Sequence, residues 1–422
     1  MRSISISPPP GPFSRMTVRP PGSKSHTIRA LFAAAGAAGV STLSGALVSD
    51  DTERARDCLT ALGAGFAEID GHLSVTGPTG GFAAPGRALD AGESGLTSRF
   101  LMALAPFIPA PVVIEGKGRL PQRPMDALLD NLALRGAKIG QEYPWRIDAT
   151  TARKAGRLIV DAATSSQMVS ALMLAAPLAE EPTELLVINM ESSAQYVSLT
   201  TEVMGAFGAR VETTGEGYRI EGGGYAPASY EVPIDASSAV YPACAAALTG
   251  GVVEIRGDMG KHPDRLIVEI LVQMGCSTET TAGGVVVRGP ERLEPIDVDM
   301  SSAPDAAVCL AVVCTRATGA SRISGLESLR HKESDRIEAL KTELTKFGAG
   351  IVTERASIEV VPGPGRPAEF EVHNDHRIAM SLALLGLVVE GVTVMDPDVV
   401  NKTWPAYWEW LATTGAIIAK SG

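Results

Sequence analysis

Residues 22–35 read GSKSHTIRALFAAA, a short polar start followed by an Ala-rich apolar stretch. Ser, Thr, Asp and Asn cap helix N-termini because their short side chains accept hydrogen bonds from the first backbone N–H groups. The same pattern occurs five more times in the chain. The other copies are GESGLTSRFLMALA (92–105), ATSSQMVSALMLAA (163–176), DASSAVYPACAAAL (235–248), MSSAPDAAVCLAVV (300–313) and NDHRIAMSLALLGL (374–387). We therefore expect a repeated unit that contains one buried helix with a polar N-terminus.

A second marker follows each polar start after about 40 residues. It is a Gly-Ala or Gly-Cys step at the end of an amphipathic pattern, and the glycines lie about 70 residues apart. They are Gly63, Gly136, Gly208, Gly275, Gly348 and Gly415. Glycine adopts the left-handed conformation after a helix without a Cβ penalty, so each should end a surface helix. Short β-branched stretches at 112–115, 185–189 and 252–256 read as strands. The alternative is an ordinary α/β protein in which these features recur by chance.

The repeats predict an α/β (α+β) protein of two compact domains with three units each, because a period this long does not suit a linear array. The boundary should lie near residues 230–233, before the fourth polar helix start. If the buried helices of a domain are parallel, their positive N-terminal ends face one cleft, which suits phosphate or carboxylate groups.

Composition excludes several classes of protein. The 422 residues carry a formal net charge of −11, which argues against general nucleic-acid binding. Five scattered cysteines show neither disulfide nor metal-ligand spacing and are expected to be reduced. The start of the chain lacks an apolar signal segment, and the longest apolar run, 378–395, is interrupted by Glu390. We expect a cytoplasmic protein without a membrane partner.

Cationic residues lie in the loops and helix starts of these repeats. They are Lys24, Arg29, Arg123, Lys332, Arg336, His376, Arg377 and Lys402. A cation at a helix N-terminus opposes the helix dipole, so an anionic ligand should be present to offset it. Simple caps and solvated surface charges are the alternative. The pattern predicts an enzyme that binds phosphorylated, anionic small molecules.

Taken together, the motifs resemble the 5-enolpyruvylshikimate-3-phosphate synthase family. They are PPGSKSHTIRA, SDDT, SSQMVSAL, DASSA, PDAA, HKESDR, NDHRIAM and NKTWPAYW, and they span nearly the whole chain. The resemblance implies two domains of three βαβαββ units each, an inside-out α/β barrel arrangement, at 20–232 and at 1–19 plus 233–422. It implies transfer of the enolpyruvyl group of phosphoenolpyruvate to the 5-hydroxyl of shikimate 3-phosphate, with release of phosphate, in aromatic amino acid biosynthesis. It further implies a monomer with no cofactor or metal.

The resemblance also implies the site residues. Shikimate 3-phosphate would contact Lys24, Ser25, Arg29, Ser165, Ser166, Gln167, Ser193, Asp305, Ser328 and Lys332, with Tyr196 as a neighbour. Phosphoenolpyruvate would contact Lys24, Gly95, Arg123, Gln167, Arg336, His376, Arg377 and Lys402. The catalytic residues would be Asp305, Glu333, Lys24 and Lys332.

The chemistry of these residues suits addition followed by elimination. Asp305 would accept the proton of the attacking hydroxyl, with Lys332 beside it. Glu333, and Lys24 as an alternative, would transfer the proton at the methylene carbon. Cations beside Glu333 lower the pKa of a carboxyl group, which makes its role as an acid harder.

The sequence departs from the family pattern at three places. Glu93-Ser94-Gly95-Leu96 replaces Asn-Ala-Gly-Thr, Ser328 replaces a common Asn, and Ala194-Gln195 replaces a basic residue and Pro. Leu96 loses a hydroxyl and adds bulk, so we expect weaker binding of the inhibitor glyphosate, which occupies the phosphoenolpyruvate site in this family.

Three other functions are open. UDP-N-acetylglucosamine enolpyruvyl transferases share the fold, but that family has Lys-Asn where this chain has Lys24-Ser25, and usually a Cys in the loop that corresponds to 117–123. A paralogue in a secondary pathway and a non-catalytic anion-binding paralogue are the others. Loss of Lys24 or Asp305 would indicate the last of these, and both residues are present.

Overall fold

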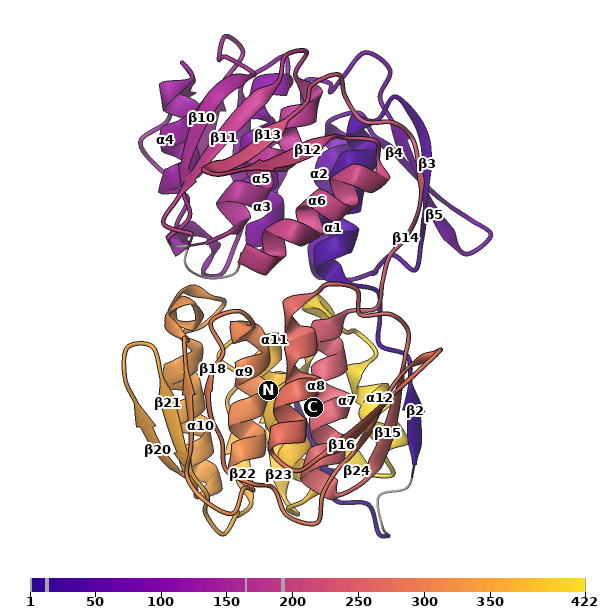
Figure 1. Cartoon of the computed structure of the whole chain (residues 1–422), viewed down its shortest axis with the longest axis vertical. Coiled ribbons are helices and arrows are strands. Elements are labelled where there is room, and N and C mark those ends of the chain that lie inside the picture. The colour runs from indigo at the N-terminus through magenta and orange to yellow at the C-terminus, as the bar shows by residue number, and fades with distance from the viewer. Residues whose placement is uncertain (1, 12–14, 164, 191–193, 422) are drawn as a thin grey trace. The chain divides into compact units, whose positions relative to one another are not determined.

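The structure is a computed structural model that describes residues 2–11, 15–163, 165–190 and 194–421. Contacts divide the chain into two compact units (Figure 1). Unit 1 comprises Met1–Pro21 and Ile234–Gly422, and unit 2 comprises Gly22–Pro233. Among the described residues, no helix has both the length and the apolar character that a membrane span requires.

Each unit contains three four-stranded sheets in its described part, and all of them share one strand order. In one sheet, β10 (Gly156–Asp161) pairs in parallel with β11 (Thr183–Ile188), which pairs antiparallel with β13 (Gly217–Ile220), and β12 (Val211–Thr214) follows. A parallel pair needs a crossover helix, whereas an antiparallel pair closes through a short hairpin. The shared order is therefore the order of a βαβαββ unit.

Unit 2 contains three such repeats. The first consists of β14 (Ser229–Glu231), α1 (Lys24–Gly36), β3 (Gly39–Ser44), α2 (Asp50–Ala61), β4 (Gly65–Ile69) and β5 (His72–Gly77). The second consists of β6 (Leu89–Asp90), α3 (Gly95–Leu104), β7 (Val112–Glu115), α4 (Asp126–Leu134), β8 (Lys138–Ile139) and β9 (Trp145–Asp148). The third adds α5 (Gln167–Ala175) and α6 (Ala194–Ala206) to the strands β10 to β13.

Unit 1 repeats the arrangement. Its first repeat is β2 (Met16–Val18), α7 (Ala236–Thr249), β15 (Val252–Arg256), α8 (Leu266–Gln273), β16 (Ser277–Thr281) and β17 (Gly284–Arg288). The second is β18 (Asp297–Asp299), α9 (Pro304–Cys314), β19 (Ser321–Ser324), α10 (Arg336–Phe347), β20 (Gly350–Thr353) and β21 (Ile358–Val361). The third is β22 (Ala368–Phe370), α11 (His376–Ala383), β23 (Val392–Met395), α12 (Tyr407–Thr413), β24 (Ile417–Ser421) and β1 (Ser3–Ser7).

Short 3-10 helices connect several of these elements. They are η1 (Ala105–Phe107), η2 (Leu120–Gln122), η3 (Ala176–Leu178), η4 (Pro263–Arg265), η5 (Glu327–His331), η6 (Leu384–Leu387) and η7 (Pro397–Lys402). Four of them, η2, η4, η5 and η7, carry or precede charged residues of the site described below.

Some sheets contain a strand that is far from the other strands of the same sheet in sequence. β14 comes after every other strand of unit 2 in sequence, yet it pairs with β3 and completes the first repeat. β2 pairs with β15, and β1 pairs with β23 and β24 at the other end of the chain. The sheets thus tie distant segments of each unit together.

The helices with polar starts form the core of each unit. In unit 2, α1, α3 and α5 pack against one another, with sheets on opposite sides of them (Figure 1). In unit 1, α9 packs against both α7 and α11. Nearly all residues of these helices are buried, and their many alanines allow the backbones to approach closely. These helices are consequently held in place by packing along most of their length.

The predicted helix ends are confirmed at all six marker glycines. Gly63, Gly136, Gly208, Gly275, Gly348 and Gly415 have φ values of 97°, 99°, 82°, 98°, 102° and 84°. The strands predicted at 112–115 and 252–256 correspond to β7 and β15. The prediction at 185–189 was wrong at its ends, because β11 spans Thr183–Ile188 and Asn189 has a φ of 56°. That left-handed residue ends the strand.

Candidate active-site clusters

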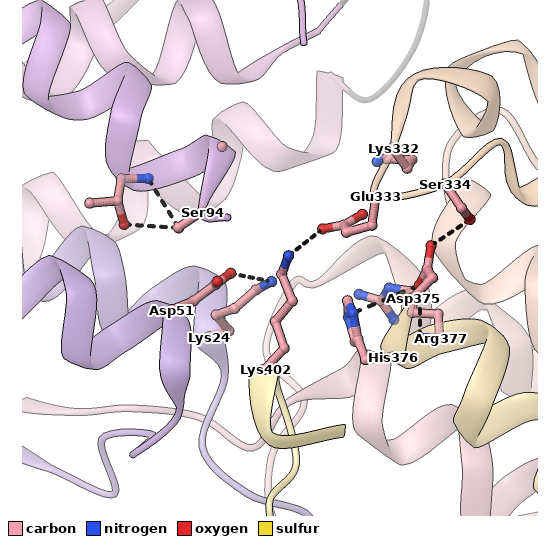
Figure 2. Close-up of polar contacts among 12 residues, drawn as sticks. Lys24, Asp51, Ser94, Lys332, Glu333, Ser334, Asp375, His376, Arg377 and Lys402 are labelled. Carbon is pink, nitrogen blue, oxygen red and sulfur yellow. Dashed lines mark hydrogen bonds and ion pairs between the residues drawn. The ribbon is translucent and has the colours of Figure 1, made fainter. Parts of the chain in front are cut away.

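The start of α1 in unit 2 carries a buried ion pair. Ser23 caps the helix and accepts a hydrogen bond from the N–H of His26. The next residue, Lys24, places its Nζ 3.1 Å from Oδ2 of Asp51 in the first turn of α2 (Figure 2). The two side chains are 17% and 6% exposed. Asp51, which belongs to the SDDT motif, therefore offsets part of the positive charge at this helix start. The sequence had predicted an anionic ligand for that role.

Arg29 lies one turn further along α1, in the core of unit 2. It is 1% exposed, and every acceptor of its guanidinium among the described residues is neutral. These acceptors are Thr200 Oγ1 at 2.7 Å, Ser25 O at 2.9 Å, Ser170 Oγ at 3.2 Å and Tyr196 O at 3.3 Å. Burial lowers the pKa of Arg29 to about 10. Within the described residues no carboxylate forms an ion pair with Arg29, so its charge favours an anion nearby.

The start of α3 brings two further guanidinium groups to Gly95. Arg99 donates to Gln167 Oε1 at 2.7 Å and to Gly95 O at 3.1 Å. A Cβ atom on Gly95 would lie 2.7 Å from Nη1 of Arg99 and 2.8 Å from Nη1 of Arg123. A side chain at this position would displace the ends of both Arg side chains, so glycine lets both guanidinium groups approach. Sequence reasoning missed Arg99, although its place four residues after Gly95 repeats that of Arg29 after Ser25.

The remaining predicted residues of unit 2 lie at the start of α5 or outside the described residues. Ser165 Oγ accepts a hydrogen bond from the N–H of Gln167 at 3.2 Å, and Ser166 is buried. Ser193 is outside the described part of the chain. Leu96 is 7% exposed and belongs to the apolar core of unit 2. The Leu96 side chain therefore packs mainly within this core, at the start of α3.

Unit 1 contains a denser charge network centred on Arg336, the first residue of α10. Its side chain is 1% exposed and binds three carboxylates. They are Asp305 at 2.7 Å, Glu333 at 2.9 Å and Asp375 at 2.8 Å. Burial alone would lower the pKa of Arg336, but these three carboxylates raise it above its ordinary value. Arg336 is therefore a permanent, fixed cation.

Asp305 lies in the first turn of α9, directly after Pro304. Its Oδ1 is 3.1 Å from Nζ of Lys332, and its Oδ2 is 3.3 Å from Nη2 of Arg377. Burial alone would raise the pKa of Asp305, but Lys332, Arg377 and Arg336 together hold it well below its usual range. At neutral pH Asp305 is therefore a carboxylate, which can accept a proton.

Glu333 and Asp375 connect the network to two more helix starts. Glu333 Oε1 lies 3.4 Å from Nζ of Lys402 at the end of η7 (Figure 2). Asp375 caps α11, where it accepts a hydrogen bond from the N–H of Arg377 at 2.9 Å, and it also accepts one from Ser334 Oγ at 3.0 Å (Figure 2). Sequence reasoning did not single out Asp375; its cap position in NDHR was the available signal.

The structure thus joins Asp305, Lys332, Glu333, Arg336, Arg377 and Lys402 in one network. Two other predicted residues of unit 1 lie at its edge. His376 Nδ1 is 3.8 Å from Oδ1 of Asp375. Ser328, in η5, has a covered Oγ that makes no hydrogen bond within the described residues. Its predicted contact with a phosphate stays a prediction.

Asp264 is a fully buried carboxyl group that the sequence did not indicate. It accepts a hydrogen bond from Ser237 in the first turn of α7, and its N–H donates to His262 Nδ1 at 3.2 Å. Burial raises the pKa of Asp264, with Arg377 as the main opposing charge. Within the described residues, no group of three or more His, Cys, Asp or Glu side chains is placed to hold a metal ion.

Comparison with known proteins identifies the family. The family model for EPSP synthase (3-phosphoshikimate 1-carboxyvinyltransferase) matches residues 14–411. The 3-phosphoshikimate 1-carboxyvinyltransferase of Methanoculleus marisnigri is 37% identical over 96% of this chain and 98% of that protein. The enzyme of the same name from Rhizobium leguminosarum bv. trifolii is 36% identical over 98% and 97%.

A solved structure agrees with this assignment. EPSP synthase from Acinetobacter baumannii has a TM-score of 0.84 and 27% identity, and the match covers 100% of both chains. This likeness confirms the predicted α/β fold class. The relatives favour the phosphoshikimate enzyme over the UDP-N-acetylglucosamine transferase and the non-catalytic paralogue. The chain belongs to the EPSP synthase (3-phosphoshikimate 1-carboxyvinyltransferase) family.

Proposed function

We propose that this protein transfers the enolpyruvyl group of phosphoenolpyruvate to the 5-hydroxyl of shikimate 3-phosphate and releases phosphate. The observation that carries the proposal is the pair of carboxylates on one guanidinium: Arg336 binds both Asp305 and Glu333. Addition needs a base near the nucleophilic hydroxyl and an acid near the methylene carbon, and elimination reverses the second transfer. Two carboxylates in different surroundings, fixed by one buried cation, suit these two tasks.

We assign shikimate 3-phosphate chiefly to the polar cluster of unit 2. Arg29 supports this assignment, because its buried charge has only neutral acceptors among the described residues. The other proposed contacts are Lys24, Ser25, Ser165, Ser166, Gln167 and Ser193 from unit 2, with Asp305, Ser328 and Lys332 from unit 1. An anionic substrate beside Arg29 would offset part of the cost of burying that guanidinium.

We assign phosphoenolpyruvate to the cations near Gly95 and to those of the Arg336 network. The proposed contacts are Lys24, Gly95, Arg123 and Gln167, together with Arg336, His376, Arg377 and Lys402. Arg336 has five N–H donors. Among the described residues, four are used in its bonds to Asp375, Asp305 and Glu333, which leaves one on Nη1 for a ligand.

Asp305 is the proposed base, because three cations keep it ionised. Lys332 lies beside it and can stabilise the charge that develops on the substrate oxygen. Glu333 is the proposed acid at the methylene carbon, but Arg336 and Lys402 both oppose its protonation. A bound anion would weaken that opposition, and Lys24 is the alternative proton donor.

A phosphate-release assay tests the proposal. Purified protein should release phosphate when both substrates are present and none with either alone, and the reaction should be measured with and without glyphosate. Turnover with UDP-N-acetylglucosamine in place of shikimate 3-phosphate would indicate the related transferase. No phosphate release with either acceptor would indicate a non-catalytic protein.

We further propose that the protein acts as a cytoplasmic monomer without a cofactor, and that its units are the expected domains at 20–232 and at 1–19 plus 233–422. All five cysteines are free and buried, which suits a reducing compartment. Light scattering during gel filtration will test the oligomeric state.

Leu96 carries a prediction about inhibition. Replacing it with Thr restores the family residue at the second position of α3 and removes apolar bulk from the helix start. We expect Leu96→Thr to lower the inhibition constant of glyphosate more than the KM of phosphoenolpyruvate. It should also reduce stability by about 1–2 kcal/mol, because it places a hydroxyl in an apolar core. An inhibition constant equal to that of the parent would contradict this prediction.

A further inference from the structure

The segment before α11 contains a tight turn with two successive residues at positive φ. His373 and Asn374 have φ values of 53° and 54°, and the N–H of Asp375 donates to Val372 O at 2.8 Å. Two central residues with positive φ are typical of a type I′ turn, which favours Asn and Gly. Asn374 fits this preference. His is found at positive φ more often than most residues, but its Cβ still makes this conformation less favourable for His373 than it would be for Gly. A contact from outside the turn would stabilise His373 in this conformation.

Glu343, in the third turn of α10, holds the turn. Its side chain is 0% exposed. Its Oε1 lies 2.8 Å from Nε2 of His373, and its Oε2 accepts a hydrogen bond from the N–H of Glu371 at 3.0 Å. Lys346 lies 2.7 Å from the same Oε2 and offsets its charge. The buried carboxylate of Glu343 thus contacts the chain on both sides of Val372, through Oε2 at Glu371 and through Oε1 at His373.

The turn leads directly into the charge network. Its last residue, Asp375, caps α11 and accepts two hydrogen bonds from Arg336, at 2.8 Å and 3.2 Å. Helix α10 carries Arg336 at its start and Glu343 two turns later. One rigid helix therefore sets the positions of both partners, Arg336 directly and Asp375 through His373.

We propose that Glu343 and His373 are positioning residues: they hold the turn at Val372–Asp375 so that Asp375 keeps Arg336, and through it Asp305 and Glu333, in the geometry for reaction. The catalytic part of this inference rests on the proposed function, whereas the contact between Glu343 and His373 is tested separately. A displacement of about 1 Å in a catalytic group can lower a rate about 100-fold.

Three variants test the positioning role. His373→Leu keeps a side chain at positive φ but removes the contact with Glu343, and it should lower kcat/KM roughly 10- to 100-fold, mainly through kcat. His373→Gly removes the same contact but adopts positive φ without penalty, so it should recover to within about fivefold of the parent. The matched control is Asp70→Leu. Asp70 has a φ of 52° in the hairpin turn between β4 and β5. It is exposed and lies in unit 2, so kcat/KM should be unchanged.

Nuclear magnetic resonance of protein with ¹⁵N-labelled histidine tests the contact without turnover. The chain has six histidines, and His373→Leu identifies the signals of His373 by their loss. Glu343→Gln should shift those ring-nitrogen signals in the free protein. Unshifted signals, or a His373→Leu enzyme as active as Asp70→Leu, would overturn the inference. If the parent itself releases no phosphate, the proposed function fails, and the nitrogen signals still decide whether Glu343 holds His373.

Discussion

Asp305→Asn will lower kcat roughly 1000-fold and leave the fold intact. The change replaces one carboxylate oxygen with an amide nitrogen of nearly the same size, so packing at the start of α9 is preserved. The amide cannot accept the proton of the attacking hydroxyl, and general base catalysis contributes about 10²- to 10⁴-fold. Asn also removes the charge that offsets Lys332 and Arg377. The KM values of the two anionic substrates should therefore stay the same or fall.

Steady-state and single-turnover phosphate release are the measurements for this variant. Asp297→Asn is the matched control, because Asp297 is an exposed Asp in β18 of the same repeat, and its kcat should equal that of the parent. If Asp305→Asn turned over at the rate of Asp297→Asn, Asp305 would not be the base, and the charge network would have to serve binding alone.

The lowered pKa of Asp305 also predicts how the stability of the folded protein depends on pH. Its pKa in the folded protein is below the ordinary value, so folding favours the carboxylate form. The resulting stabilisation is fully present above the ordinary Asp pKa of about 3.9 and is lost as the pH falls through the lower folded value. Urea denaturation from pH 6 to pH 3 should show a smaller loss of stability in Asp305→Asn than in the parent. Equal losses would mean that the three cations do not lower the pKa of Asp305.

The sequence predicted the repeated unit because its markers are local. Gly63 and its five counterparts need a left-handed conformation whatever surrounds them, and caps such as Ser23 and Ser94 bond within their own helix starts. The ends of β11 were not predictable in the same way. Strand pairing with β10 begins at Thr183, and that pairing depends on residues about 30 positions away.

The candidate site residues show the same difference between contacts within a short segment and contacts between distant elements. Glu333 and Arg336 are near neighbours in HKESDR, so the motif indicated their contact directly. Asp51, Arg99 and Glu343 were not named as site residues, although Asp51 lies in the SDDT motif, because each gains its role from a partner on another element. Asp51 contacts Lys24 of α1, Arg99 contacts Gln167 of α5, and Glu343 contacts His373 before α11. Comparing equivalent positions among the repeats would have found Arg99, but it would not have found Glu343.

Arg336→Met should have the largest effect on stability, a loss of about 3–5 kcal/mol in the free energy of unfolding. Methionine fills much of the same space, so packing changes little. It leaves Asp305, Glu333 and Asp375 without their shared cation, and Asp375 is 0% exposed. Lys332, Arg377 and Lys402 still offset Asp305 and Glu333, so most of the loss should come from Asp375. Activity should fall at least 1000-fold, because both proposed acid–base groups lose their common support.

Urea denaturation measures the loss, and Arg322→Met is its control. Arg322 is 49% exposed and has one carboxylate partner in the described part of the chain, Glu354 at 3.3 Å, so removing it should cost less than about 1 kcal/mol. Adding Asp375→Asn to Arg336→Met should restore part of the lost stability, because it removes the buried charge. Equal unfolding free energies for Arg336→Met and Arg322→Met would show that Arg336 does not hold the network together.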